Sequence, residues 1–175
     1  DEDEDLERLL RKLKRVLDEI RKRIRENIEE NREVVERAAR EVKKSIDENR
    51  KVVDDVQLPD EELRKLREDS ERKVREIERR IEEIKKDSDR LARELEKTLE
   101  DLARKVEKTE RELRREGGKG EEVRKKIEDL ERELRRTLEE IHKENEKSKR
   151  KIEKALRDIR EENKKHIREI EETKR

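Results

Sequence analysis

The chain has 175 residues, the size of one ordinary domain, and 63% of them are charged, with 55 basic and 55 acidic side chains that cancel to a net charge of zero. This balance lacks the basic excess that binds nucleic acid or anionic lipid, and the absence of Phe, Tyr and Trp removes the rings that stack on bases. Without cysteine there is no disulfide, thiolate nucleophile or thiolate metal site. No apolar run approaches the ~20 residues of a membrane span, and no targeting signal is recognisable. We therefore expect a soluble protein with no nucleic-acid and no membrane partner.

The low apolar content makes disorder the first alternative to a folded domain. The chain contains 17 Leu, 13 Ile and 10 Val, which is only slightly more than the aliphatic content below which disorder is expected. Disordered chains of this kind usually carry a high net charge as well, and this chain does not. The spacing of the apolar residues therefore has to decide between the two states.

The first segment is predicted to form a helix over residues 3–56, beginning within the acidic run 1–5 that suits the positive end of a helix dipole. Its apolar stripe advances in steps of 3, 4, 3, 4 and 4 residues, and the same five steps then repeat. Five turns in 18 residues give the period of a straight α-helix, whereas a heptad repeat imposes a left-handed supercoil. The stripe consists of Leu6, Leu9, Leu13, Val16, Ile20, Ile24, Asn27, Asn31, Val34, Ala38, Val42, Ser45, Asn49, Val52 and Val56.

The stretch "QLPDEE" contains the only proline and is predicted to hold a loop at residues 57–59. Pro59 suits the first turn of a helix, and the three acidic residues that follow it favour the positive end of the dipole. A second helix is predicted over residues 60–116. Its stripe has the same 18-residue cycle and consists of Leu63, Leu66, Ser70, Val74, Ile77, Ile81, Ile84, Ser88, Leu91, Leu95 and Leu99.

The stretch "EGGKGEE" contains all three glycines and is predicted to hold a loop at residues 117–120. Gly117 is expected to close the second helix in the left-handed conformation. The spacing differs from that of a phosphate-binding loop, and no strand precedes it. A third helix is predicted over residues 121–174, with Lys174 and Arg175 at its negative end. Its stripe includes Val123, Ile127, Leu130, Leu134, Leu138, Ile141 and Ile159.

Three helices with one apolar stripe each predict an all-α fold. We expect a straight, nearly untwisted up-down-up antiparallel three-helix bundle with an 18-residue core repeat, forming a single elongated domain over residues 1–175. Adjacent apolar pairs such as Leu9-Leu10 and Val34-Val35 widen each stripe, as contact with two neighbouring helices requires. No second stripe is left over to line an exposed binding groove.

Polar residues interrupt the stripes at matching heights in the three predicted helices. When the chain is folded back at its loops, two layers result, and equivalent members such as Asn31 and Asn49 lie 18 residues apart. A buried amide without a partner costs about 1–3 kcal/mol, so a satisfied network would penalise wrong registers and helix orders. The alternative is that some members, chiefly Ser70 and Ser88, lie at stripe edges and bond to water. The first layer comprises Asn27, Asn31, Ser88, Asn145 and Ser148, the second comprises Ser45, Asn49, Ser70, Asn163 and His166, and Thr98 and Thr137 would add a smaller contact.

The two histidines are weak candidates for chemistry. His142 and His166 lie about 36 Å apart along one predicted helix, so they cannot share a metal ion, and neither has a nucleophile or a cleft for acid–base catalysis. Glu146 lies one turn from His142, but any Glu-rich helix offers such a pair. We expect no catalytic residue, no cofactor and no metal site. His166 is interpreted as a network member and His142 as a boundary residue, and a buried neutral imidazole would respond to pH.

Taken together, these features resemble computationally designed parametric helical bundles with buried hydrogen-bond networks. The likeness covers the whole chain and rests on the 18-residue cycles, the Leu/Ile/Val/Ala core, the Glu/Lys/Arg/Asp surface, the "GGKG" and "LPDEE" connectors and the layered Asn, Ser and His positions. It implies a structural scaffold with no natural biochemical function and no enzymatic activity, produced in the cytoplasm of an expression host. The zero net charge departs from the pattern, because designed surfaces usually carry net charge for solubility.

Natural helical proteins fit the sequence less well. Spectrin-like repeats share the topology but rely on core aromatic residues, and charged single α-helices lack a continuous apolar stripe. A lipid-surface helix would segregate basic and aromatic residues. The alternative of a different class is a coiled-coil-like tether or adaptor, or a component of an engineered, pH-responsive helical assembly, which would need an exposed groove.

The sequence predicts a monomeric rod that requires no partner, although an engineered helical partner could occupy one groove. At 1.5 Å per residue, small-angle scattering should give a maximum dimension of about 80 Å together with the mass of a single chain. A maximum dimension of about 40 Å, or the mass of a dimer, would contradict this prediction.

Overall fold

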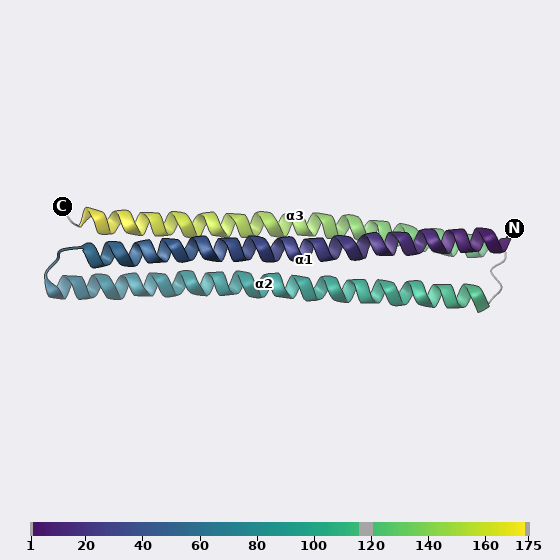
Figure 1. Cartoon of the computed structure of the whole chain (residues 1–175), viewed down its shortest axis with the longest axis horizontal. Coiled ribbons are helices and arrows are strands. Elements are labelled where there is room, and N and C mark those ends of the chain that lie inside the picture. The colour runs from purple at the N-terminus through teal and green to yellow at the C-terminus, as the bar shows by residue number, and fades with distance from the viewer. Residues whose placement is uncertain (1, 116–120, 174–175) are drawn as a thin grey trace. The chain divides into compact units, whose positions relative to one another are not determined.

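Three long helices account for almost all of the described chain. The computed structural model describes residues 2–115 and 121–173. In Figure 1, α1 comprises Glu2–Asp55, α2 comprises Asp60–Arg115 and α3 comprises Glu121–Glu172. No strand occurs within the two described ranges. The predicted all-α three-helix bundle is confirmed, and the helix ends lie within a residue or two of the predicted positions.

The N-terminus of α2 is formed by the proline loop. Leu63 N donates a hydrogen bond to Pro59 O at 2.9 Å, so Pro59 accepts the first bond of the helix and stands immediately before it. This is one position ahead of the first-turn site that the sequence predicts, because the carbonyl of a capping residue already belongs to the helical ladder. Acidic residues 60–62 occupy the first turn and two arginines the last, each opposite in sign to the partial charge of that helix end.

Two groups of predicted residues lie outside the described ranges. These are the glycine loop 117–120 and the closing residues Lys174 and Arg175. The residue that follows α3, Thr173, is the last one described. Its Oγ1 donates a hydrogen bond to Ile170 O at 2.6 Å. A side-chain hydroxyl thus satisfies one of the carbonyls that a helix C-terminus leaves without an intrahelical partner.

The chain divides into two compact units, each built from segments of all three helices. The first unit contains the described residues of Asp1–Glu30 and Arg90–Lys147, and the second contains those of Asn31–Asp89 and Ser148–Arg175. Each unit has apolar clusters of its own. A single, straight and nearly untwisted domain stays a prediction.

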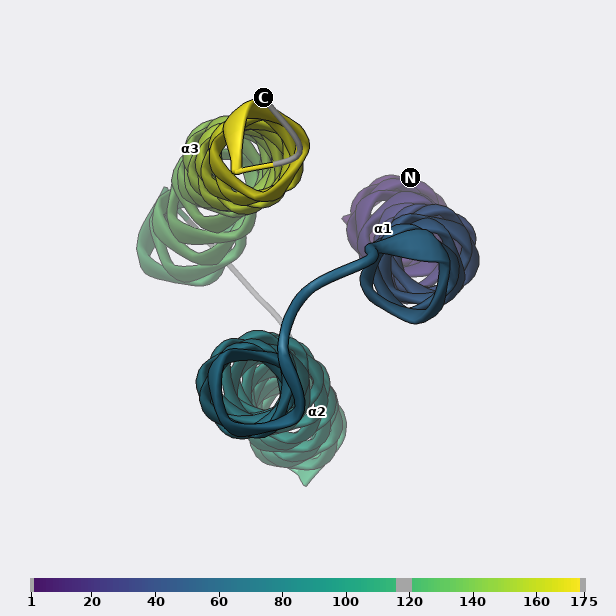
Figure 2. The same cartoon turned by 90° about the vertical axis from the view of Figure 1, so that its left-hand side faces the viewer.

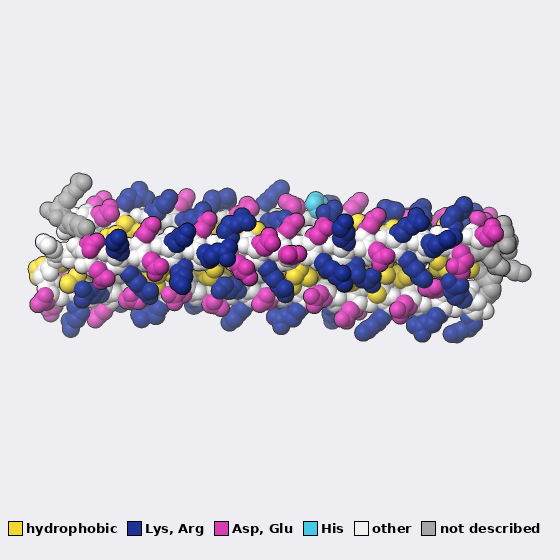
Figure 3. Space-filling view, in the orientation of Figure 1, with side chains coloured by type: hydrophobic (Ala, Val, Ile, Leu, Met, Phe, Trp, Pro, Cys, Tyr) yellow, Lys and Arg dark blue, Asp and Glu magenta, His cyan; other side chains and the backbone are white. Residues whose placement is uncertain are grey.

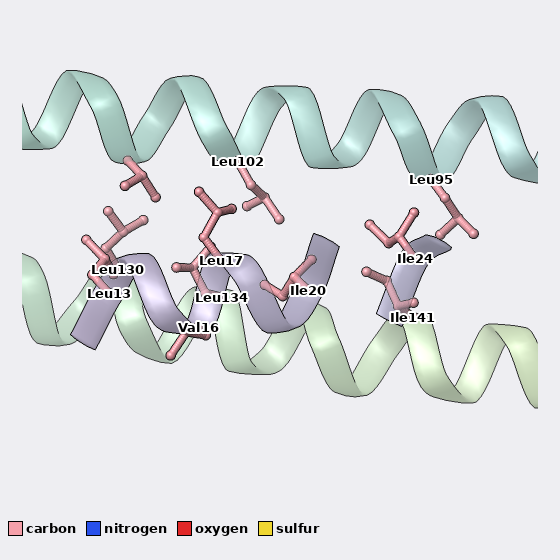
Figure 4. Packing of buried hydrophobic residues seen from close by; sticks show 11 residues of the cluster. Leu13, Val16, Leu17, Ile20, Ile24, Leu95, Leu102, Leu130, Leu134 and Ile141 are labelled. Carbon is pink, nitrogen blue, oxygen red and sulfur yellow. The ribbon is translucent and has the colours of Figure 1, made fainter. Parts of the chain in front are cut away.

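Aliphatic side chains from all three helices form the core of the first unit. Figure 4 shows part of this core, in which Leu17 and Ile20 of α1, Leu102 of α2 and Leu134 of α3 belong to one cluster. Ile20 and Leu134 have no exposed surface, and a fully buried aliphatic side chain contributes about 1.5–3 kcal/mol. The cluster extends over Leu13, Val16, Leu17, Ile20, Ile24, Leu95, Leu102, Val106, Leu130, Leu134 and Ile141.

Ion pairs on the first unit establish the directions of its helices. In the pairs between α1 and α2, residue numbers rise along one helix as they fall along the other, so these helices are antiparallel. In the pairs between α1 and α3, both numbers rise together, so these helices are parallel, as an up-down-up order requires. Such exposed pairs contribute little to stability. The pairs are Glu7–Arg114, Lys14–Glu110, Asp5–Arg124 and Lys12–Glu131, with N–O distances between 2.6 and 3.8 Å.

The second unit has two apolar clusters, and the three helices that form them stand at the corners of a triangle in Figure 2, where this unit faces the viewer. One cluster includes Val42, Ile77 and Ile159. The other includes Val53 and Ile170. Four of the five residues of the second predicted layer lie between the two clusters in the sequence of their helices: Asn49 of α1, Ser70 of α2, and Asn163 and His166 of α3.

Candidate functional site

A chain of hydrogen bonds crosses the core of the second unit and joins all three helices. Asn49 Nδ2 of α1 donates to Asn163 Oδ1 of α3 at 3.1 Å. Ser70 Oγ of α2 donates to Asn49 Oδ1, and Asn163 Nδ2 donates to the backbone carbonyl oxygen of Ser45 at 2.9 Å. We call Asn49, Ser70, Asn163 and the Ser45 carbonyl the polar network.

One group at the end of the polar network determines the direction of every bond in it. The Ser45 carbonyl can only accept, so Asn163 has to present its NH₂ group there and its oxygen to Asn49. Asn49 therefore presents its own NH₂ group to Asn163 and its oxygen to Ser70, whose hydroxyl is the donor that this oxygen needs. The amide orientations thus follow from the chemistry of the partners.

The members of the polar network are as deeply buried as the aliphatic residues around them. Asn49 is 1% exposed, and Ser70 and Asn163 are each 3% exposed. Buried amides and hydroxyls have no water to replace a lost partner, so each bond has to be made within the protein. Sliding one helix past another by a single turn, about 5.4 Å, would break bonds of this length. The network therefore discriminates between registers far more sharply than aliphatic contacts do.

The structure places the members of the second predicted layer in different roles. Asn49, Ser70 and Asn163 lie at the same height and bond to one another. Ser45 contributes its backbone carbonyl rather than its hydroxyl. Ser70 is buried and donates to Asn49, in contrast to the alternative in which it lies at a stripe edge and bonds to water.

His166 lies in the same region, but its hydrogen-bond partner is not a member of the polar network. The residue is 6% exposed, and Lys73 Nζ lies 3.0 Å from its Nδ1. A lysine ammonium can only donate, so Nδ1 accepts and the neutral ring carries its proton on Nε2. Nε2 is buried and has no hydrogen-bond partner among the described residues. His166 is therefore a neighbour of the polar network and is bonded to α2 through Lys73.

The surroundings of His166 disfavour its charged form. Burial lowers the pKa of the His166 imidazole below its usual value, and the ammonium of Lys73 lowers this pKa further. The carboxylates of Glu169 and Asp69 act in the opposite direction and offset part of the effect. The net result is a histidine that stays neutral to lower pH than an exposed one.

Lys73 is the residue of this site that sequence reasoning missed. Its side chain is about half exposed, and its ammonium also lies 3.8 Å from Glu169 Oε2. In the sequence it looks like an ordinary surface charge. The signal that could have identified it is its position three residues after Ser70, because residues at that spacing share one face of a helix.

The first predicted layer is divided between the two units. Asn27 and Asn145 belong to the first unit, whereas Asn31, Ser88 and Ser148 belong to the second. The three asparagines are buried, and the two serines are half-buried. A common layer formed by these five residues stays a prediction.

Other polar candidates have local or exposed roles. Thr98 Oγ1 donates to Glu94 O at 3.0 Å, and Thr137 Oγ1 donates to Glu133 O at 2.9 Å. Each threonine thus bonds within its own helix instead of forming the small contact that the sequence predicts, since a hydroxyl in a helix readily reaches the carbonyl four residues before it. His142 is exposed. No group of three or more His, Asp or Glu residues arranged to hold a metal ion occurs among the residues that the structure describes.

Replacing Asn49 with leucine should destabilise the protein although leucine is apolar. The Asn49→Leu variant leaves the Ser70 hydroxyl and the Asn163 oxygen buried without their partner, and each such group costs about 1–3 kcal/mol. Guanidinium unfolding should therefore show a clear loss of unfolding free energy. Glu48→Leu, the same substitution at the exposed neighbouring position, is the control and should change stability by less than about 0.5 kcal/mol. Equal effects of the two variants would contradict the assigned bonds.

Acid should destabilise the protein through His166. Because the folded-state pKa of His166 is lowered, the unfolded state binds the proton more readily, and stability should decrease as the pH falls through the unfolded value of about 6.5. Guanidinium melts at about pH 7.5 and about pH 5.0 measure the difference. His166→Asn should have the smaller pH dependence, and equal pH dependence in both proteins would show that His166 is not responsible.

Comparisons with known proteins complete the description of the chain. Among the described helices, none contains an apolar stretch that could span a lipid bilayer. No protein-family model, no curated protein and no solved structure matches the sequence or the fold. The residues and their contacts are therefore the basis for a functional proposal.

Proposed function

We propose that the chain is a designed structural scaffold that serves to hold three helices in one register and one order, without a catalytic role. The observation that carries the proposal is the polar network, in which Ser70, Asn49 and Asn163 link all three helices and end on the Ser45 carbonyl. A helix in the wrong register or order would leave these groups buried and unpaired.

The energetics of such a network favour specificity over stability as its purpose. Replacing a satisfied buried polar group and its partners with apolar residues of similar shape is often neutral or stabilising. An all-aliphatic layer at residues 49, 70 and 163 would therefore hold the helices together at least as strongly. Placing amides there adds a penalty for wrong arrangements, which is the best-attested use of buried polar residues in helical assemblies.

The surface and composition also support a scaffold. No large hydrophobic side chain is exposed in the described part of the chain, and Figure 3 shows acidic and basic side chains intermixed over the visible face. An adaptor would have to bind its partner through these charged side chains. The lack of aromatic residues and the 18-residue cycle are typical of a core calculated from a small set of aliphatic side chains.

Replacing all three side chains of the polar network with apolar ones tests whether the network contributes to the choice of register rather than to stability. The triple variant Asn49→Leu/Ser70→Ala/Asn163→Leu leaves no side-chain partner unpaired, so its resistance to guanidinium should equal or exceed that of the parent. After refolding over a range of concentrations, it should nevertheless give extra backbone-amide NMR resonances or oligomers in light scattering.

The matched control is Ile46→Val/Ile77→Val/Ile159→Val, which alters three core positions and keeps the polar network. This variant should lose some stability but refold to one monomeric species. A triple network variant that also gives one set of resonances and one mass would contradict the proposal that the network specifies the arrangement.

A further inference from the structure

We propose that Lys73 and His166 form a proton-controlled latch between α2 and α3, closed when the imidazole is neutral and opened locally by mild acid while the polar network stays intact. The latch goes beyond the scaffold role, because a scaffold needs a fixed register and does not need a contact that depends on pH. It also differs from a general loss of stability, because its opening is confined to one pair of helices.

The closed state depends on a single acceptor atom. Nδ1 of His166 accepts from Lys73 Nζ at 3.0 Å, and Nε2, which carries the proton, is buried with no partner among the described residues. The imidazole therefore has one hydrogen bond, which joins α3 to α2 beside the ion pairs Lys73–Glu169 and Arg80–Glu162. Without this hydrogen bond, nothing would compensate the cost of removing the polar atoms of the buried ring from water.

Protonation turns this bond into a repulsive contact. The imidazolium carries an N–H at both nitrogens, so Nδ1 no longer accepts, and two donors with positive charge face each other at 3.0 Å. Lys73 can shift to a second partner on α3, since Glu169 Oε2 lies 3.8 Å from its ammonium, and this half-exposed ion pair holds the two helices together only weakly. Lys73 is about half exposed and can make this move without crossing the core.

A groove between α2 and α3 provides the space for opening. Its volume is about 240 Å³, and the imidazole of His166 lines it, so the ring can turn towards carboxylates and water once it is charged. The charged residues that line the groove are Lys73 and Glu76 of α2 and Glu162, Lys165 and Glu169 of α3, and α1 contributes no residue to it. The carboxylate of Asp69 on α2 also acts on the charge of the ring.

The opening stays local because the polar network anchors α3 to a different helix. Asn163, one turn before His166, bonds to Asn49 and to the Ser45 carbonyl, and both of these belong to α1. None of these groups changes its protonation in mild acid. The part of α3 around residue 166 can therefore separate from α2 while its register against α1 is kept.

NMR of the full chain in the His142→Gln background tests the latch. This substitution removes the only other histidine, so every imidazole signal belongs to His166. At neutral pH the ¹⁵N signals should report the proton on Nε2. As the ring titrates, hydrogen exchange of the amides at residues 164–170, corrected for its intrinsic pH dependence, should accelerate about tenfold, as the loss of one stabilising hydrogen bond would give. Amides of the first unit should show no such step.

Two lysine variants separate the contact from a general charge effect. Lys73→Gln removes the cation at Nδ1 and should raise the pKa of His166, because one of the two causes that lower it is gone. Lys165→Gln removes the same charge from another position lining the groove, where no bond to the imidazole is made, and should change the pKa of His166 less.

Three results would overturn the latch. The first is a neutral ring with its proton on Nδ1, and the second is an equal effect of Lys73→Gln and Lys165→Gln. The third is an exchange step spread evenly over the whole chain, which would indicate global destabilisation. Each result is independent of the refolding test of the polar network, so the latch and the scaffold role can fail separately.

Discussion

The arrangement of polar side chains in the second unit depends on one requirement: a buried amide needs hydrogen-bond partners for both its NH₂ group and its oxygen. Asn49 lies among aliphatic side chains with 1% of its surface exposed, so its partners have to come from the protein, and they come from the other two helices. Aliphatic packing is non-directional and roughly proportional to buried area, so it stabilises many arrangements of the same helices. Aliphatic burial is the main source of stability in such a core, and we propose that the polar network selects one arrangement from those that the clusters allow.

Periodicity in the sequence was enough to predict the three helices, the proline loop and the common height of Asn49, Ser70 and Asn163, but not the hydrogen-bond role of each residue. The 18-residue cycle and the two breaker segments locate the helices, and folding the chain at the loops puts Asn49, Ser70 and Asn163 at one height. A pattern of positions contains no information on rotamers, so it could not show that Ser45 uses its carbonyl or that both threonines bond within their own helices. Lys73 was not predicted as a site residue for another reason. A long side chain can begin at the surface and still place its ammonium against a buried ring.

Asn163 and His166 lie one turn apart on α3, and the contrast between them shows why amides suit a fixed network. An asparagine donates and accepts at the same time in one protonation state, and Asn163 uses both functions. A neutral imidazole also has one donor and one acceptor, but the donor of His166 meets no partner among the described residues. The half-satisfied ring costs stability and makes the contact sensitive to protons, while the amide next to it does neither.

The surface of this chain explains why specificity has to come from the interior. With 55 basic and 55 acidic residues in fine alternation, almost any register would place some Lys or Arg near some Asp or Glu. Exposed pairs such as Arg50–Glu71, at 3.2 Å, are weak and screened by salt, so exchanging one set for another changes little. The aliphatic stripe is equally permissive, since Leu, Ile and Val recur at every turn. Buried groups with fixed donors and acceptors are less permissive, and the three side chains of the polar network supply such groups across all three helices, which is why we propose that they specify the register.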